Sequence, residues 1–219
     1  ALITEFYQPL DPRARIFIAP RLALERRSMT LYQGEERIAT YDLRSSLVGL
    51  DLGSQFYHYG EVRFGVLRGK ATPSLDTGPP SLSPGQANIS QGAFTARLFL
   101  DQIDSVHFPR SGWRGGLKVF NSKSGLGADD SYTKWDVDGV AAYSIGDHTL
   151  NFAVKAGGKI GSDPLPRYDQ FQWGGFMQQS GYQPGQLYGE SVRFARAMYF
   201  HRIARGSLLD GAYGGFSLE

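Results

Sequence analysis

The sequence predicts an all-β protein, an antiparallel β-barrel of the outer-membrane type that crosses a bilayer with its strands. Three observations predict this class. Apolar and polar residues alternate with period two over long segments, which is the pattern of a strand with two different faces. The expected strands are about 12–16 residues long, against the ~5–6 residues typical of globular sheets. Charges recur on the polar faces, where a dry sandwich core would not tolerate them but a wet lumen would.

Nine segments carry the alternation, and a short stub precedes them, so about nine to ten strands are expected from the 219 residues. They are residues 15–27, 36–53, 59–71, 91–103, 112–123, 131–146, 148–159, 191–204 and 208–219. We expect residues 1–219 to form one barrel domain with an incomplete set of strands. Because both ends have the pattern of an interrupted strand, we also expect the chain to be part of a longer protein.

The apolar face of each segment is expected to contact lipid. The residues predicted to do so are Ile16, Ile18, Leu22, Phe64, Phe94, Leu98, Leu100, Trp135, Val137, Leu150, Phe152 and Val154. The opposite face of residues 131–146 carries Lys134, Asp136 and Asp138, which we expect to form a ladder of charges facing the lumen.

The connections between the expected strands fall into two sets. Every second link, starting with residues 8–14, has 7, 5, 8, 1 and 3 residues, whereas the others have 8, 19, 7 and 31. Outer-membrane barrels have short periplasmic turns and longer external loops in this alternating sense. The 19-residue link, residues 72–90, contains four prolines and is expected to be a solvated loop that does not pair.

Composition excludes several other classes. Mean hydropathy is −0.31 and no run of eighteen apolar residues occurs, so no spanning helix is expected. The formal net charge is +2 without a basic stripe, so a nucleic-acid partner is not expected. The chain has no cysteine and four scattered histidines, so we expect no metal site and no cofactor. The Gly215–Glu219 run fails the Gly-x-Ser-x-Gly pattern of a nucleophile elbow, so no catalytic residue and no enzyme activity are expected in this segment.

The most informative link is the loop of residues 160–190, because a loop this long inside a compact β domain is usually functional or disordered. Its glycines permit positive φ or a close backbone approach, as a loop folded into a narrow lumen requires. Its candidate structural residues are Phe171, Trp173, Gly174, Gly175, Phe176, Ser180, Gly181 and Tyr182.

Two further motifs accompany the loop. Asp104-Ser-Val-His-Phe108-Pro109-Arg-Ser-Gly112 lies on the side of the short links, between two expected strands. The N-terminal run Glu5-Phe-Tyr-Gln-Pro-Leu-Asp11 is followed by Ile16-Phe-Ile-Ala-Pro20.

These motifs resemble the BamA-like outer-membrane barrel superfamily. The loop is similar to its inward-folded loop, Phe-x-x-Gly-Gly followed by Arg-Gly-Phe/Tyr, and Phe108, Pro109 and Gly112 match its Asp-x-x-x-Phe-Pro-x-x-Gly turn. The N-terminal run resembles the barrel joined to patatin-like phospholipases in type Vd autotransporters. One position departs from the superfamily pattern, because Ser180 stands where the arginine that pairs with acidic wall groups would be. We therefore expect Tyr182, Arg193 or Arg196 to hold the loop instead.

The resemblance implies a translocator and anchor portion of a patatin-like autotransporter phospholipase in the bacterial outer membrane, with any lipase domain upstream. Its implied partners are outer-membrane lipids and the protein's own upstream passenger domain, and a homodimer is left open. One alternative is a BamA- or TamA-like insertion barrel or a two-partner-secretion barrel. Another, from a different class, is a soluble β-barrel or sandwich that binds a ligand such as a glycan or a lipid.

Overall fold

The structure is a computed structural model that describes residues 1–13, 15–83, 88–204 and 211–219. Thirteen strands make up nearly all regular structure in these residues. The helices among them are three single 3-10 turns, η1 (Pro80–Leu82), η2 (Ser124–Leu126) and η3 (Arg167–Asp169). In this part of the chain, none of the helices has the length and apolar character needed to cross a membrane. The expected all-β fold is confirmed.

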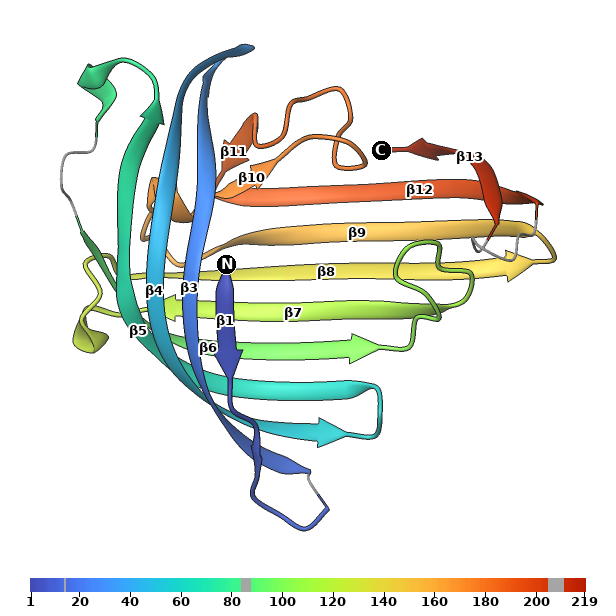
Figure 1. The fold of residues 1–219 in the computed structure, drawn as a ribbon, viewed down its shortest axis with the longest axis horizontal. Coiled ribbons are helices and arrows are strands. Elements are labelled where there is room, and N and C mark those ends of the chain that lie inside the picture. The colour runs from blue at the N-terminus through green and yellow to red at the C-terminus, as the bar shows by residue number, and fades with distance from the viewer. Residues whose placement is uncertain (14, 84–87, 205–210) are drawn as a thin grey trace.

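One curved antiparallel sheet contains eleven strands, and each strand of its main path lies beside its neighbour in the chain (Figure 1). The path runs β1-β3-β4-β5-β6-β7-β8-β9-β12-β13, and β2 pairs with β3. In the described residues the edge strands β1 and β13 do not pair with each other, so this barrel wall is open. The strands are β1 (Leu2–Glu5), β2 (Gln8–Pro9), β3 (Ile16–Gln33), β4 (Glu36–Phe56), β5 (Gly60–Thr77), β6 (Ile89–Asp101), β7 (Gly112–Ser122), β8 (Tyr132–Ile145), β9 (His148–Ile160), β12 (Ser191–Ala204) and β13 (Ala212–Leu218).

The first hairpin is longer than the sequence predicted. The expected link at residues 28–35 is wrong, because β3 continues to Gln33 and β4 begins at Glu36. Only a tight turn remains, with Gly34 at a φ of 64°. At this hairpin end the alternation continues with its faces exchanged, because Met29 and Leu31 lie on the inner face and Ser28 and Thr30 on the outer face.

The expected loop at residues 72–90 is also too long, because β5 continues to Thr77. Pro73 lies in the ladder opposite Leu43 of β4. Pairing of β5 with β6 stops at Ala71, so this end of β5 has a neighbour on one side only. Proline is tolerated at such an edge position because its missing N–H removes no ladder bond there.

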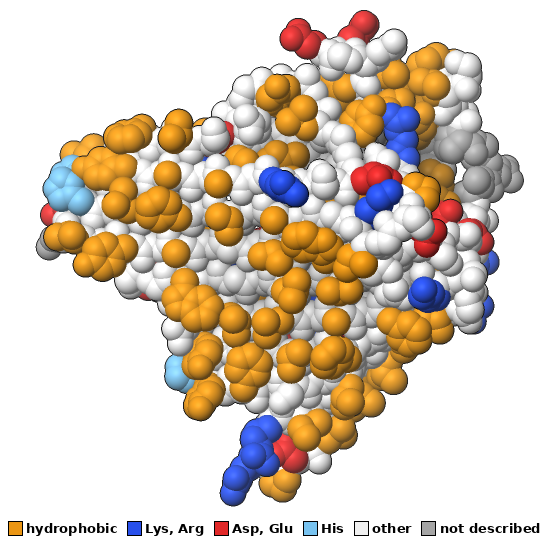
Figure 2. Space-filling model, turned by 180° about the vertical axis from the view of Figure 1, so that it is seen from behind, with side chains coloured by type: hydrophobic (Ala, Val, Ile, Leu, Met, Phe, Trp, Pro, Cys, Tyr) orange, Lys and Arg blue, Asp and Glu red, His pale blue; other side chains and the backbone are white. Residues whose placement is uncertain are grey.

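The register places the twelve predicted lipid-facing side chains on one face of the sheet, here called the outer face. Leu98, Leu117 and Val137, for example, lie directly opposite one another across β6, β7 and β8. Figure 2 shows hydrophobic side chains gathered over this wall with few charged ones between them. Phe64 is 62% exposed and Phe152 is 52% exposed, so no second layer of the described chain covers them. A two-layer sandwich would bury these side chains, so that alternative does not describe this molecule.

The other face, here called the inner face, carries the paired charges and receives the long loop. The connections at one end of the strands are residues 34–35, 78–88, 123–131 and 161–190, and those at the other end include residues 57–59, 102–111 and 146–147. We call these ends the long-loop rim and the short-turn rim. By the general rule for outer-membrane barrels, the long-loop rim is external.

The two faces should respond oppositely to the same substitution. Phe152→Arg places a cation on the outer face and should lower the free energy of unfolding in a bilayer by roughly 2–4 kcal/mol. Phe99 is similarly exposed, at 46%, but lies on the inner face beside Glu61 and Asp138. Phe99→Arg should therefore stay within about 0.5 kcal/mol of the wild type. Urea titrations followed by heat-modifiable gel mobility measure both, and equal losses would contradict the assignment of the faces.

Candidate functional site: the loop on the inner face

The loop between β9 and β12 has its own structure. Strands β10 (Phe171–Trp173) and β11 (Leu187–Gly189) pair antiparallel, with Phe171 opposite Gly189 and Trp173 opposite Leu187. The short segment η3 precedes this hairpin, and the two glycine motifs lie in the connection between β10 and β11. The loop therefore presents ordered side chains to the wall at both of its ends.

The segment at η3 is bound to the inner wall by a buried cluster. Asp169 accepts a hydrogen bond from the Tyr132 hydroxyl at 2.6 Å and pairs with Lys134 Nζ at 2.5 Å, both from β8. From the opposite wall, Arg27 Nη2 of β3 donates to the Tyr168 backbone oxygen at 2.5 Å. Burial, and then the Asp130 carboxylate that accepts from its hydroxyl, raise the pKa of Tyr168. These contacts connect two separate parts of the wall through the loop.

The end of the loop is held by Glu190. Its carboxylate pairs with Lys159 Nζ at 2.9 Å and accepts the Leu165 backbone N–H at 2.8 Å. The Lys159 hydrogen bond, followed by that of the Leu165 amide, lowers the pKa of Glu190. Because a carboxyl with a depressed pKa is favoured as the anion, this attachment is complete above the ordinary glutamate pKa and weakens as pH falls below it.

The paired glycines allow the chain to fold back on itself. Gly174 and Gly175 have φ of 122° and 103°, a region that side chains with a Cβ rarely adopt. A Cβ on Gly174 would lie 2.4 Å from the Gln183 oxygen, so only glycine fits there. Gly175 N–H donates to the Tyr182 oxygen at 2.9 Å, which connects the two glycine motifs.

Ser180 contacts a carboxylate although it is not an arginine. Its backbone N–H donates to Glu219 Oε2 at 2.6 Å and its hydroxyl donates to Glu219 Oε1 at 3.0 Å. Glu219 follows β13 directly, so the loop tip is bound to the last strand of the described sheet. The sequence predicts a substitute for the arginine among other residues, but Ser180 itself meets a carboxylate, because its backbone amide and hydroxyl together supply two donors.

Of the predicted substitutes for the arginine, Arg196 donates a hydrogen bond to the loop, whereas no hydrogen bond or ion pair among the described residues connects Arg193 to it. Arg196 Nη1 on the inner face of β12 donates to the Met177 oxygen at 3.1 Å. Arg193 lies opposite Ala156 on the outer face. Tyr182 is 42% exposed and has no aromatic ring contact within the described residues.

The aromatic loop residues differ in their surroundings. The Trp173 ring packs on Phe194 of β12, with centroids 5.0 Å apart. The Phe171 ring lies over Gly157 of β9, where a Cβ would come within 2.7 Å of it. Phe176 is 83% exposed, and a Cβ added at Gly181 would meet open space. Trp173 and Phe171 therefore attach the loop to the wall, whereas Phe176 and Gly181 make no such contact.

The predicted turn motif packs at the opposite, short-turn rim. Phe108 stacks on Tyr213 with centroids 4.6 Å apart and meets Phe200 edge-on at 6.0 Å. Asp104 Oδ1 accepts the Arg110 backbone N–H at 2.9 Å, which closes the turn around Pro109. Gly112 has a φ of 95°, and a Cβ there would lie 2.0 Å from the Gln102 oxygen. The motif thus joins the β6–β7 connection to β12 and β13.

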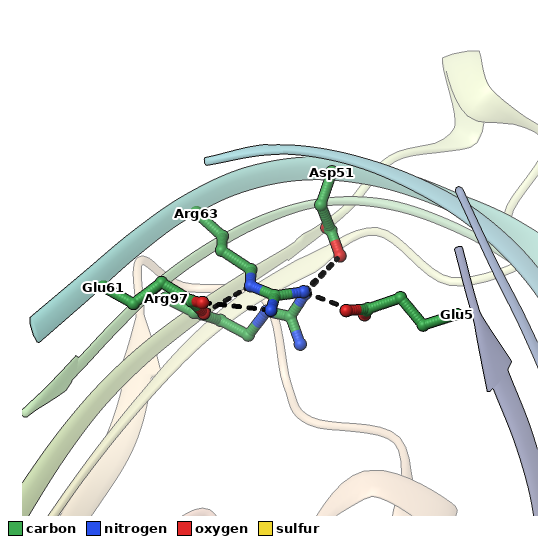
Figure 3. A network of polar contacts seen from close by, with 5 residues as sticks. All are labelled: Glu5, Asp51, Glu61, Arg63 and Arg97. Atoms are coloured by element: carbon green, nitrogen blue, oxygen red, sulfur yellow. Dashed lines mark hydrogen bonds and ion pairs between the residues drawn. The ribbon is translucent and has the colours of Figure 1, made fainter. Parts of the chain in front are cut away.

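A second group of inner-face charges surrounds Arg63 of β5 (Figure 3). Arg63 pairs with Glu61, with Glu5 of β1 at 2.8 Å, and with Asp51 of β4 at 4.0 Å. Asp51 also pairs with Arg97 of β6. Asp51 is 2% exposed, so these partners compensate a buried charge. The network connects β1 to three strands of the wall, and no residue pattern within a single segment indicates it.

Two of the charges expected to form a ladder on β8 pair with residues of other segments instead. Lys134 pairs with Asp169 of the loop, and Asp136 pairs with Lys155 of β9 at 2.9 Å. In the part of the chain that the structure describes, no three His, Cys, Asp or Glu side chains are grouped to hold a metal ion. The inner face carries ion pairs, some within the wall and some between the wall and the bound loop.

A wall of long antiparallel strands with an apolar outer face, a charged inner face and a long loop folded onto that inner face defines an outer-membrane β-barrel protein. The profile of the Omp85 superfamily domain matches residues 5–203. The chain belongs to the Omp85 superfamily, and it is part of a bacterial outer-membrane protein.

A solved structure with the same fold is BamA from Haemophilus ducreyi lacking POTRA domains 1–3. The TM-score is 0.73 at 10% identity, over 94% of this chain and 46% of that chain. At this identity the likeness shows the fold alone, and the chain spans less than half of the BamA chain. A comparison with curated protein sequences finds no match.

Removing the Glu219 carboxylate should release the loop tip. In Glu219→Ala, the Ser180 amide loses its acceptor, so its hydrogen exchange should become faster while that of the Tyr132 region stays unchanged. Ser180→Ala is the matched control, because it keeps the backbone N–H and should change this exchange less. Unchanged Ser180 exchange in Glu219→Ala would show that the contact does not hold the tip.

Arg63→Met should destabilise the wall, because it leaves three carboxylates without their shared cation. Removing one partner of a buried ion pair typically costs about 3–5 kcal/mol. Arg63→Lys keeps the charge but loses the multidentate geometry, so an intermediate loss of unfolding free energy is expected. Urea unfolding in detergent micelles measures both variants, and an Arg63→Met protein as stable as the wild type would contradict the role of the network.

Proposed function

We propose that this barrel is the outer-membrane anchor and translocator of a patatin-like autotransporter, with the lipase domain upstream of the segment and no catalysis within it. The observation that carries the proposal is the loop bound to the inner face from two sides of the wall. A loop fixed in this way occupies part of the lumen, and many of its attachments are polar contacts that water can replace. Such a wall suits the passage or placement of an attached domain.

The N-terminal run supports the autotransporter branch. Its Tyr7 ring stacks on Phe17 with centroids 4.4 Å apart, and Asp11 accepts the Ile16 backbone N–H at 2.9 Å. Glu5 joins the Arg63 network. The run that resembles the patatin-linked barrels is therefore ordered against the inner face. A passenger domain attached before it would be mechanically coupled to the wall.

A BamA-like insertion barrel is the second candidate, and the fold likeness to BamA favours it. Outer-membrane lipids are proposed partners in both cases, and a second copy of the chain is a further proposed partner.

Arg196→Ala and Glu219→Ala in the full-length protein should distinguish the candidates. For an autotransporter, we expect at least about a tenfold loss of surface-exposed esterase activity in intact cells, with unrelated porins still heat-modifiable. The loss should reflect export, so activity in lysed cells should remain. Impaired assembly of unrelated porins with no esterase activity in the wild type would instead favour the insertion barrel and contradict the proposal.

A further inference from the structure

Cations gather on one part of the outer face, next to the long-loop rim. Arg26, Arg44 and Lys70 point outward from β3, β4 and β5, and Arg68 lies one outward position below Lys70. The outward positions of β6 to β9 carry no Lys, Arg, Asp or Glu. The cations of the outer face are therefore grouped on β3 to β5, apart from Arg193 on β12.

Two of these cations face each other directly. Arg26 and Arg44 are register partners in the β3–β4 ladder, and like charges at such a position are destabilising unless something neutralises them. Asp42 pairs with Arg26 and also accepts from Ser28. No salt bridge of the described residues includes Arg44, Arg68 or Lys70, and Asp42 interacts with Arg44 only electrostatically. The cluster therefore keeps an excess of positive charge that an external anion could neutralise.

The cations border a groove of about 610 Å³ on the outer face. Its lining includes the polar side chains of Arg44, Lys70 and Thr72 and the apolar side chains of Ala1, Leu2 and Leu24. Glu25 also borders the groove, but it alternates to the inner face with Arg27 and borders the inner cavity. The groove thus offers cations and hydrocarbon contact within one surface.

The groove lies at the upper edge of the apolar belt. Directly below it, Leu22 and Val48 are register partners on the outer face, with Arg68 opposite Val48 on β5. Leu50 and Val66 form the next outward pair below. The cations are level with the start of β6, because Lys70 lies opposite Ser90. A ligand there would have its polar part at the rim and its apolar part against the belt.

We propose that this groove binds the phosphate groups of a phosphorylated outer-leaflet lipid, with Arg44 and Lys70 as the main contacts. Its acyl chains lie along Leu24, Leu22 and Val48. The lining is amphipathic, so it favours a lipid over a free anion. Inorganic phosphate could contact the cations, but it would leave the apolar side chains of the groove uncovered. The inference rests on the membrane placement of the barrel but is independent of any passenger domain.

The test uses the full-length protein in zwitterionic detergent, titrated with diphosphorylated lipid A and followed by native mass spectrometry. Basic residues near an anionic lipid surface contribute on the order of 1 kcal/mol each, so the Arg44→Gln/Lys70→Gln variant should bind about 30-fold more weakly. The matched control is Arg13→Gln/Arg193→Gln, which removes two exposed cations outside the groove and should change the affinity less than about threefold.

Three further measurements decide the source and cause of binding. Lipid A should displace phosphatidylcholine, and inorganic phosphate should fail to displace lipid A. The charge-preserving variant Arg44→Lys/Lys70→Arg should bind like the wild type, and all variants should remain heat-modifiable. Equal affinity of the Gln variant, displacement by inorganic phosphate, or loss of binding in the charge-preserving variant would each overturn the proposal.

Discussion

A strand that crosses hydrocarbon must pair every backbone N–H and C=O with its neighbours, and this constraint shapes the rest of the structure. Because the side-chain period is two, a slip of one residue would turn each outward leucine into the lumen and each charge into lipid. The ladders keep an unbroken register across the apolar belt, as between Tyr41 and Phe56 of β4 and their partners on β5. The three irregularities of register lie near Leu31, Thr40 and Arg202, at the ends of strands. Irregular pairing is thus confined to places where water can satisfy an unpaired group.

The same constraint explains why the inner face is so rich in paired charges. Half of each strand must face inward, and apolar residues there would invite collapse of the lumen, whereas unpaired charges would be costly. Arg63 with its three carboxylates and Lys155 with Asp136 solve this within the wall. Asp169 and Glu190 extend the solution to the loop, since each meets a lysine of the wall. The loop therefore supplies carboxylates that pair with lysines of the wall, and it also occupies part of the lumen.

The sequence predicts a strand correctly where one face meets lipid and the other meets the wet lumen. Only there do apolar outward residues alternate with polar inward ones. The prediction fails at the first hairpin and at the end of β5, where the outer face becomes polar and apolar residues such as Leu31 and Leu75 lie on the inner face. The apolar stripe changes sides there while hydrogen bonding continues. Local conformational demands are also readable, and Gly174 and Gly175 have the positive φ that their spacing suggests. Long-range partners are not readable. Ser180 and Glu219 are 39 residues apart, and nothing local to either marks the contact. The same holds for Glu5 and Arg63, which are separated by 58 residues.

The two rims of the outer face differ in kind. At the short-turn rim, Tyr143 of β8 and Tyr199 of β12 point outward. The Tyr199 hydroxyl shares a hydrogen bond of 2.6 Å with His148 Nδ1. Aromatic side chains with a polar tip suit a membrane interface irrespective of the lipid charge. At the long-loop rim, Arg44 and Lys70 take this place on β4 and β5. Guanidinium and ammonium groups distinguish between headgroups by charge, which aromatic rings do not. The wall therefore carries cations at the long-loop rim of β4 and β5 and aromatic rings with polar tips at the short-turn rim of β8 and β12.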